Sequence, residues 1–255
     1  MVTLRIKGLE FSYESESVFS GIDLNIEEGD LISIVGRNGA GKSTLLKCIN
    51  HILTPEKGDI YHNDIDVQSM RLLERAQRLG YLSQKQEQVF PSTVFDVVLT
   101  GRFPHSPIRF TNKDMDKVSE ALSMMGLQEF AHRQFNRLSG GEQQQVLIAR
   151  AIVQGADILL FDEPTNNLDL KHQLGIMKLI RRVTHKNNKT AVTAIHDLNL
   201  ASAFSDKIVV MHRGKIFSTG KPSEVLTSEN IWEVFGVDVK IYDHNGAPHI
   251  VMVGT

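Results

Sequence analysis

Residues 36–44 (GRNGAGKST) gather residue types that could do chemistry: three glycines, a lysine and two hydroxyl side chains within nine positions. Glycine lets the backbone turn tightly, so that its N–H groups and a helix N-terminus can form a cradle for phosphate oxygens. Lys42 would reach the β- and γ-phosphates, and the Ser43 hydroxyl would hold Mg²⁺. An apolar run precedes the stretch and a helical pattern follows it, which argues against an ordinary glycine turn. The stretch therefore predicts a nucleotide site.

Two adjacent carboxylates, Asp162 and Glu163, follow the apolar run 158–161. At that place Asp162 can hold Mg²⁺ directly or through water, and Glu163 can orient and deprotonate a water molecule. Taken alone, the pair also fits two acidic residues that start a turn.

Two further polar residues end apolar runs, and one aromatic residue follows the first predicted strand. Gln84 and His196 stand at the carboxyl ends of buried strands, where α/β sheets place their ligands. Tyr13 lies where its ring could stack on a purine, which is worth roughly 1–3 kcal/mol. Each has an ordinary alternative: a loop glutamine, a structural histidine and an edge-packing tyrosine.

The stretch 138–142 (LSGGE) predicts a helix start, because Ser139 and Glu142 stand three apart as in a capping box. Gly140 and Gly141 would each weaken a first helical turn by roughly 1 kcal/mol relative to alanine, so capping alone does not explain them. Bare backbone N–H groups at such a start also suit an anion.

The elements that must position these residues read as an α/β fold. Alternating apolar residues at 2–35 predict short strands in an antiparallel sheet, and four consecutive apolar residues at 158–161 suit a central parallel strand covered on both faces. Buried strands are also predicted at 31–35, 79–84 and 190–195, and helices at 45–53 and 176–183.

Helical periodicity dominates residues 86–155, which we interpret as a helical insertion in this core. Gly126 is a stop signal within it, and a proline-broken loop spans 101–107. The remainder predicts a hairpin at 213–214, a short helix from Ser223 and a tail hairpin around 245–246, where Asn-Gly favours a type I′ turn.

Composition narrows the class of protein. The 255 residues are 41% apolar and 23% charged, as in ordinary globular proteins, and the net charge of −2 gives no general attraction to nucleic acid, so no nucleic-acid partner is expected. The single Cys48 fits a reducing compartment as a small core residue. No signal-peptide pattern and no run of eighteen apolar residues occurs, so we expect a chain that neither spans a membrane nor is exported by that route.

Together these motifs resemble the ATPase subunit of ATP-binding-cassette (ABC) transporters along nearly the whole chain. The matching stretches are 36–44 (Walker A), Gln84 (Q-loop), 138–142 (the family signature), 158–163 (Walker B), 167–169 (D-loop) and His196 (switch histidine). The signature is the most specific of these, because a phosphate loop alone also occurs in kinases, GTPases and other ATPases.

This resemblance implies a head-to-tail dimer with a second copy of the chain, in which each ATP lies between the phosphate loop of one subunit and the 138–142 helix of the other. It implies catalytic roles for Glu163, His196 and Gln84, and Mg²⁺ ligands at Ser43, Gln84 and Asp162. Residues implied in ATP binding are Tyr13, Gly36, Asn38, Gly39, Gly41, Lys42, Ser43, Thr44, Ser139, Gly140, Gly141, Asp162 and Asp169. Asp169 would link the two sites of the dimer.

A narrower resemblance lies in 101–105 (GRFPH) and 196–201 (HDLNLA), which look like importer ATPases for ferric siderophores, haem and cobalamin. It implies polytopic permease subunits, a substrate-binding protein across the membrane, and a peripheral position on the cytoplasmic face of the cell membrane. The chain departs from the commonest family pattern at 143–145 (QQQ) and Arg37, which we expect to tune rates.

The resemblance also implies one ABC ATPase domain over 1–255. Its expected parts are an α/β core with the antiparallel β-subdomain (1–85 and 156–230), the helical subdomain (86–155) and a C-terminal tail hairpin (231–255). Alternatives that stay open are an importer for molybdate or another metal ion, an exporter subunit, and a soluble ABC ATPase in iron–sulfur assembly or repair.

Overall fold

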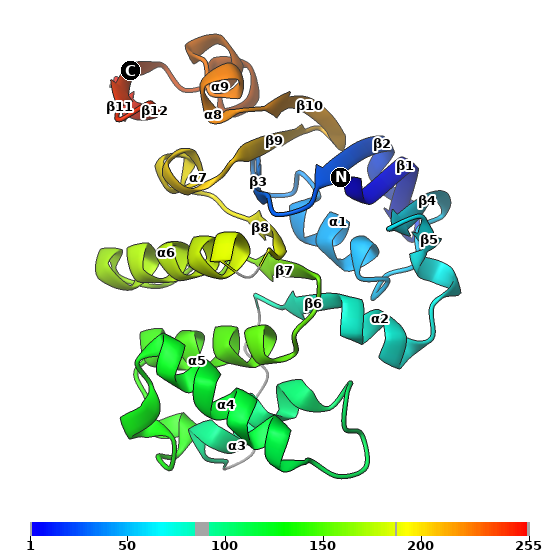
Figure 1. The fold of residues 1–255 in the computed structure, drawn as a ribbon. Helices are drawn as coiled ribbons and strands as arrows, with labels where there is room; N and C mark the ends of the chain where they lie inside the picture. The colour runs from blue at the N-terminus through cyan, green and yellow to red at the C-terminus, as the bar shows by residue number, and fades with distance from the viewer. Residues whose placement is uncertain (1, 85–91, 187, 254–255) are drawn as a thin grey trace.

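A six-stranded, mainly parallel sheet forms the centre of the computed structural model, which describes residues 2–84, 92–186 and 188–253 (Figure 1). Its strand order is β10-β9-β3-β8-β7-β6, and only β10 pairs antiparallel. The strands are β3 (Leu31–Val35), β6 (Leu79–Leu82), β7 (Ile158–Asp162), β8 (Thr190–Ala194), β9 (Lys207–His212) and β10 (Lys215–Gly220). The carboxyl ends of the parallel strands meet at one edge of the sheet, where ligands bind in such folds.

A second, four-stranded antiparallel sheet has the order β2-β1-β4-β5. Its strands are β1 (Val2–Tyr13), β2 (Glu16–Glu27), β4 (Lys57–His62) and β5 (Ile65–Asp66). The antiparallel prediction for the start of the chain is confirmed, but the prediction of short strands there is wrong, because β1 and β2 each run for 12 residues. Register shifts along their pairing break the period-two pattern that would have revealed their length.

The central strands bury both faces, and alternate side chains enter two different cores. Ile32 and Ile34 of β3 face the core shared with the antiparallel sheet, whereas Leu31 and Val35 face the core beneath the remaining helices. Helix α1 (Lys42–Ile49) lies between the two sheets (Figure 1). The loop before α1 is therefore anchored to two packed layers.

Helix α1 is shorter than predicted. The helical spacing extends to residue 53, but the helix ends at Ile49 because His51 adopts a left-handed backbone with φ of 54°. The Ile52 N–H then bonds to the Lys47 carbonyl at 2.8 Å and the His51 N–H to the Cys48 carbonyl at 2.8 Å, the two bonds of a Schellman end. A histidine occupies the position where glycine normally signals this end.

Helices of the middle of the chain form a layer below the sheet (Figure 1). They are α3 (Val94–Leu99), α4 (Asn112–Met125) and α5 (Gly140–Val153), whereas α2 (Leu72–Arg78) lies beside β6 and leads into it. Single 3₁₀ turns lie at Val67–Ser69, Thr100–Arg102, Gln128–Phe130 and Phe135–Arg137. Of the predicted insertion 86–155, residues 86–91 lie outside the described residues. Capping boxes start α3, α4 and α5, and the one predicted for Ser139 and Glu142 is confirmed.

The 101–105 stretch is fixed by a buried ion pair. Arg102 Nε donates to Asp114 Oδ1 at 2.9 Å, and its Nη1 donates to the Val153 carbonyl at 2.9 Å, at the end of α5. Asp114 also accepts from Thr111 and Ser106. Hydrogen bonds from Thr111, its backbone N–H first, and from Arg102 hold the pKa of Asp114 well below its usual range.

Asp114→Asn is expected to lower the free energy of unfolding by about 3 kcal/mol, because a buried Arg102 would lose its counter-ion. Since the folded pKa of Asp114 is depressed, its stabilisation is complete above the unfolded pKa of about 3.9 and is lost as pH falls toward the folded value. Urea denaturation should therefore show a gap between wild type and variant that narrows below about pH 4. Exposed Asp116 on the same helix is the control, and equal effects of Asp114→Asn and Asp116→Asn would contradict the assignment.

The C-terminal third adds helices to the sheet and ends in a hairpin. Besides β8, β9 and β10, its elements are α6 (Leu170–Lys186), α7 (Leu198–Phe204), α8 (Pro222–Val225), α9 (Ser228–Phe235), β11 (Val239–His244) and β12 (Ala247–Met252). Both predicted hairpin turns are confirmed, whereas α9 is an element that we did not predict and it crosses the expected boundary at 230–231. In the described part of the chain, no helix combines the length and apolarity needed to cross a membrane.

Candidate functional site

The glycine loop leaves β3 and wraps into the first turn of α1. Gly36 has φ of 153°, and a Cβ there would lie 2.3 Å from the Met211 carbonyl oxygen, so no other residue fits. Gly41 sits at the helix N-cap with φ of 96° and brings no side-chain cap. The first N–H groups of α1 are thus without a side-chain partner, as an anion site requires.

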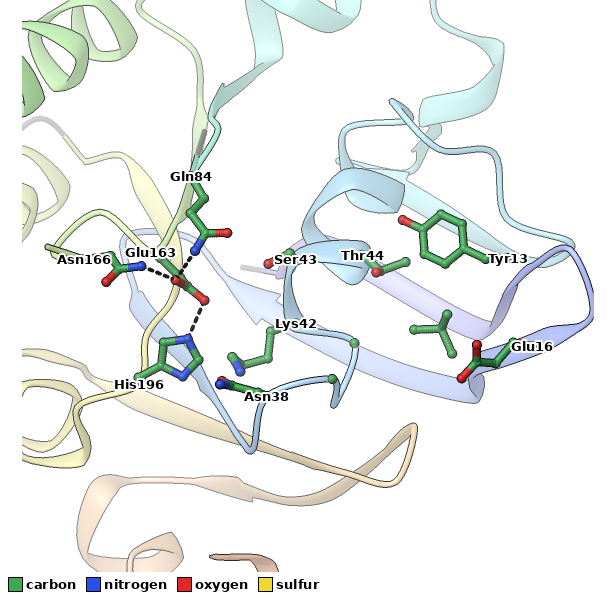
Figure 2. Close-up of a pocket in the computed structure, with 13 residues that line it drawn as sticks. Tyr13, Glu16, Asn38, Lys42, Ser43, Thr44, Gln84, Glu163, Asn166 and His196 are labelled. Atoms are coloured by element: carbon green, nitrogen blue, oxygen red, sulfur yellow. Dashed lines mark hydrogen bonds and ion pairs between the residues drawn. The ribbon is translucent and has the colours of Figure 1, made fainter. Parts of the chain in front are cut away.

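A cavity of about 780 Å³ opens beside this loop (Figure 2). Its walls come from the β1–β2 hairpin, the glycine loop, the start of α1 and the carboxyl ends of β6, β7 and β8. The lining residues are Tyr13, Glu16, Val18, Asn38, Gly39, Gly41, Lys42, Ser43, Thr44, Gln84, Glu163, Asn166 and His196. This volume is within the range of small-molecule sites.

Lys42 brings a buried cation to the cavity. Lys42 is only 5% exposed, and its Nζ donates to the carbonyl oxygens of Gly36 at 2.9 Å and Arg37 at 3.1 Å. Burial lowers the pKa of Lys42, while the nearby carboxylates of Glu163 and Asp162 act in the opposite direction. The ammonium thus lies between the loop and two acidic groups, where phosphate oxygens would be attracted to it.

Ser43 and Asp162 form an oxygen pair under the loop. Ser43 Oγ donates to Asp162 Oδ1 at 2.6 Å, and Tyr81 donates to Asp162 Oδ2 at 3.2 Å. Burial, followed by the charge of Asp162, raises the pKa of Tyr81 and keeps it a donor. A hydroxyl and a carboxylate are ligands that Mg²⁺ accepts, and Gln84 adds an amide oxygen because its Nε2 is committed to Glu163. This donor set fits Mg²⁺.

Glu163 is the acceptor on which three side chains converge (Figure 2). Gln84 Nε2 and Asn166 Nδ2 donate to Oε2, the latter at 2.9 Å, and His196 Nε2 bonds to Oε1. The backbone of Glu163 is left-handed, with φ of 51°, and its N–H bonds to the Ala194 carbonyl at 3.0 Å. These bonds aim the carboxylate into the cavity, as a general base requires.

Tyr13 lies at the opposite end of the cavity from Glu163 (Figure 2). The residue is 48% exposed, and its ring packs edge-on against Phe11, with centroids 4.9 Å apart. One face of the ring therefore stays available for stacking.

The structure does not bring every predicted site residue to this cavity. Ser139, Gly141 and Asp169 do not line it, and Gly140 lines a neighbouring hollow together with Gln84 and Glu163. The Ser139 hydroxyl instead donates to Glu142 Oε2 at 2.8 Å. Gly36 and Asp162 do not line the cavity either, but each bonds to a lining residue: the Gly36 carbonyl to Lys42 and the Asp162 carboxylate to Ser43.

Four residues at the site were missed from the sequence: Glu16, Val18, Tyr81 and Asn166. Asn166 could have been found, because its position three residues after Glu163 allows a turn, and the Asn166 N–H does bond to the Glu163 carbonyl at 3.2 Å. Glu16 and Val18 reach the cavity only through the register of the β1–β2 hairpin, which has no local signal.

Comparison with known proteins places these features in context. A family model described as "ABC transporter" matches residues 19–166. An uncharacterized ABC transporter ATP-binding protein of Methanocaldococcus jannaschii is 44% identical over 100% of this chain and 99% of its own length. A hemin import ATP-binding protein of Bradyrhizobium diazoefficiens is 38% identical over 92% of this chain and 88% of its own. A petrobactin import ATP-binding protein of Bacillus subtilis is 34% identical, over 93% and 94%.

Solved structures show the same architecture. One, described as a metal-chelate type ABC transporter in an inward-facing conformation, superposes with a TM-score of 0.86 at 29% identity and covers 100% of this chain and 98% of its own. A dimeric ATP-binding cassette in a post-hydrolysis state, bound to ADP and Pi, has a TM-score of 0.75 at 30% identity, over 86% and 98%. These likenesses confirm the predicted α/β core with its antiparallel β-subdomain and inserted helices.

Proposed function

The chain belongs to the ABC transporter family as one of its ATPases, and from this premise we propose that it energises a separate membrane permease that imports a metal chelate. The chelate would be of the ferric siderophore, haem or cobalamin class. Support comes from the hemin and petrobactin import relatives, from the metal-chelate type neighbour, and from the 101–105 and 196–201 stretches.

The observation that carries the ATPase chemistry is the position of Glu163. Its carboxylate faces the same cavity as the glycine loop and Lys42, and three side chains hold it there. A base at one end of a phosphate-binding cavity can take the proton of a water that attacks the γ-phosphate.

The proposed mechanism is phosphoryl transfer to water by positioning and electrostatics. Tyr13 stacks on the adenine, the loop N–H groups and Lys42 bind the phosphates, and Glu163 accepts the proton of the water at its carboxylate. Gln84 and His196 fix that carboxylate and respond to the γ-phosphate. Ser43, Asp162 and Gln84 would hold Mg²⁺, which supplies charge neutralisation on the phosphates.

We further propose that the site is completed by a second copy of the chain, with Ser139, Gly140 and Gly141 facing the partner's ATP and Asp169 linking the two sites. A related cassette is dimeric with ADP and Pi. A Cβ on Gly140 would meet nothing within 4 Å in this chain, so its own packing does not demand a glycine there. A group from outside the chain that approaches the start of α5 closely would require a glycine at position 140.

The proposed partners follow from the organisation of importers. They are polytopic permease subunits, on which this chain docks at the cytoplasmic face of the membrane, and a substrate-binding protein on the other side.

We also propose that the chain divides into a nucleotide-binding core (1–85 and 156–230), a helical subdomain (86–155) and a C-terminal tail (231–255).

Isolation of the tagged full chain from membranes in mild detergent tests the transport role. A stable complex with a polytopic membrane protein, whose metal-chelate uptake needs this ATPase, is the expected result. A soluble partner in iron–sulfur assembly or DNA repair would replace the proposal with that alternative. Recovery with an exporter would overturn the proposed import, and recovery with a molybdate permease would correct the substrate class. Both results would leave the ATPase chemistry in place.

A further inference from the structure

The first turns of α5 and α6 touch at Gly141 and His172. An ideal Cβ on Gly141 would lie 2.6 Å from His172 Cδ2 and 2.9 Å from its Nε2, closer than real Cβ atoms approach. The ring of His172 therefore excludes any side chain at position 141 within a single copy of the chain. A Cβ on the neighbouring Gly140 would meet no such contact. The two glycines of the signature are therefore required for different physical reasons: Gly141 by packing within the chain, Gly140 by something outside it.

His172 cannot easily move away, because Asp169 holds it. The His172 N–H donates to Asp169 Oδ1 at 2.8 Å, and Nδ1 lies 2.8 Å from the same oxygen. These bonds, the backbone one first, also lower the pKa of Asp169. The ring is thus fixed to the turn that precedes α6.

That turn begins at Glu163, and a hydrogen bond makes a second contact between it and α5. Gln144 Nε2, one turn after Gly140, donates to the Pro164 carbonyl at 3.0 Å. Asn166 bonds to the Glu163 carboxylate at 2.9 Å, and Asp169 ends the turn. A continuous set of contacts therefore joins the proposed base to the start of α5.

We propose that His172 is a positioning residue, whose ring seats the start of α5 on the turn 163–169 and so aligns Ser139 and Gly140 with the nucleotide of the partner subunit. This inference rests on the proposed two-copy site. His172 contacts no substrate in this role and acts through Gly141. The structure gives the same turn two functions: it carries Glu163 for its own cavity and sets the helix that serves the other cavity.

A double-substitution cycle on the full chain tests the contact. Gly141→Ala is expected to lower kcat about 100-fold in the wild-type background, since displacing catalytic groups by about 1 Å costs that much. In a His172→Asn background, where the smaller side chain keeps a donor for Asp169 but leaves room for the Cβ, Gly141→Ala is expected to lower kcat only about twofold. An equal loss in both backgrounds would mean that nucleotide, not His172, demands Gly141, and would overturn the inference.

Single variants separate positioning from folding. His172→Ala is expected to lower kcat about tenfold while KM and monomer ATP affinity change less than about twofold, with His172→Asn intermediate. The matched control is His185→Ala at the other end of α6, where the histidine pairs with Asp206 at 3.3 Å and lies outside the site. Unchanged kcat in His172→Ala would overturn the role.

A separate experiment distinguishes failure of the proposed two-copy site from failure of the role of His172. Glu163→Gln chain that forms no ATP-dependent dimer, seen by size-exclusion chromatography with ATP and Mg²⁺, would overturn the two-copy site and with it the role of His172. If that dimer forms but His172→Ala and the cycle show no effect, the two-copy site stands and the inference about His172 alone is wrong.

Discussion

Glu163→Gln should lower kcat for ATP hydrolysis by about 10³-fold while the affinity for ATP stays within about twofold of wild type. The amide has the size of the carboxylate but cannot accept a proton from water. Binding survives because the glycine loop, Lys42 and Tyr13 are untouched by the change. With cleavage blocked, ATP should remain between two copies, so a stable dimer should accumulate. Single-turnover hydrolysis and size-exclusion chromatography with ATP measure both effects.

The control for Glu163→Gln is Glu16→Gln, which removes a carboxylate from the same cavity at the end near Tyr13 (Figure 2). It should leave kcat within about twofold, because Glu16 lies far along the wall from the three residues that hold Glu163. Wild-type hydrolysis in Glu163→Gln would remove that residue from its role. A loss of ATP affinity as large as the loss of kcat would mean that Glu163 serves binding.

The parts of the site that the sequence predicts are those encoded by neighbouring residues. The glycine loop reveals itself because Gly36 and Gly41 need backbone conformations that other residues avoid. Strand β7 reveals itself because its four consecutive apolar residues, 158–161, suit a strand that is buried on both faces. Asp162 and Glu163 then follow by position alone.

The parts that the sequence does not predict depend on long-range register. Tyr81 reaches Asp162 only because β6 and β7 are paired neighbours, and that pairing leaves no trace in either segment. The early end of α1 is hidden because His51, not glycine, takes the left-handed conformation. The contact between Gly141 and His172 joins residues that local patterns assign to two separate helices.

Substituting the helix-start serine tests the shared site from its other half. Ser139→Arg should lower kcat more than 100-fold, as loss of a transition-state donor does, while ATP affinity of the monomer stays within about twofold. The reason for the second part is geometric: Ser139 does not line the cavity that contains Lys42 and Glu163. A bulky cation at this position would instead obstruct the face offered to the partner's nucleotide. Equilibrium ATP titration of the monomer and steady-state hydrolysis are the two measurements.

The substitution also removes a capping box, which costs about 1 kcal/mol of helix stability, so a matched cap is needed as a control. Thr93 caps α3 with Asp96 in the same arrangement, and Thr93→Arg removes that cap while the residues of the α5 cap, Ser139 and Glu142, stay unchanged. If Thr93→Arg keeps its turnover and Ser139→Arg loses it, the loss comes from the position of Ser139 at the interface. A large loss of monomer ATP affinity in Ser139→Arg would place the start of α5 in its own chain's cavity and contradict a site built by two copies.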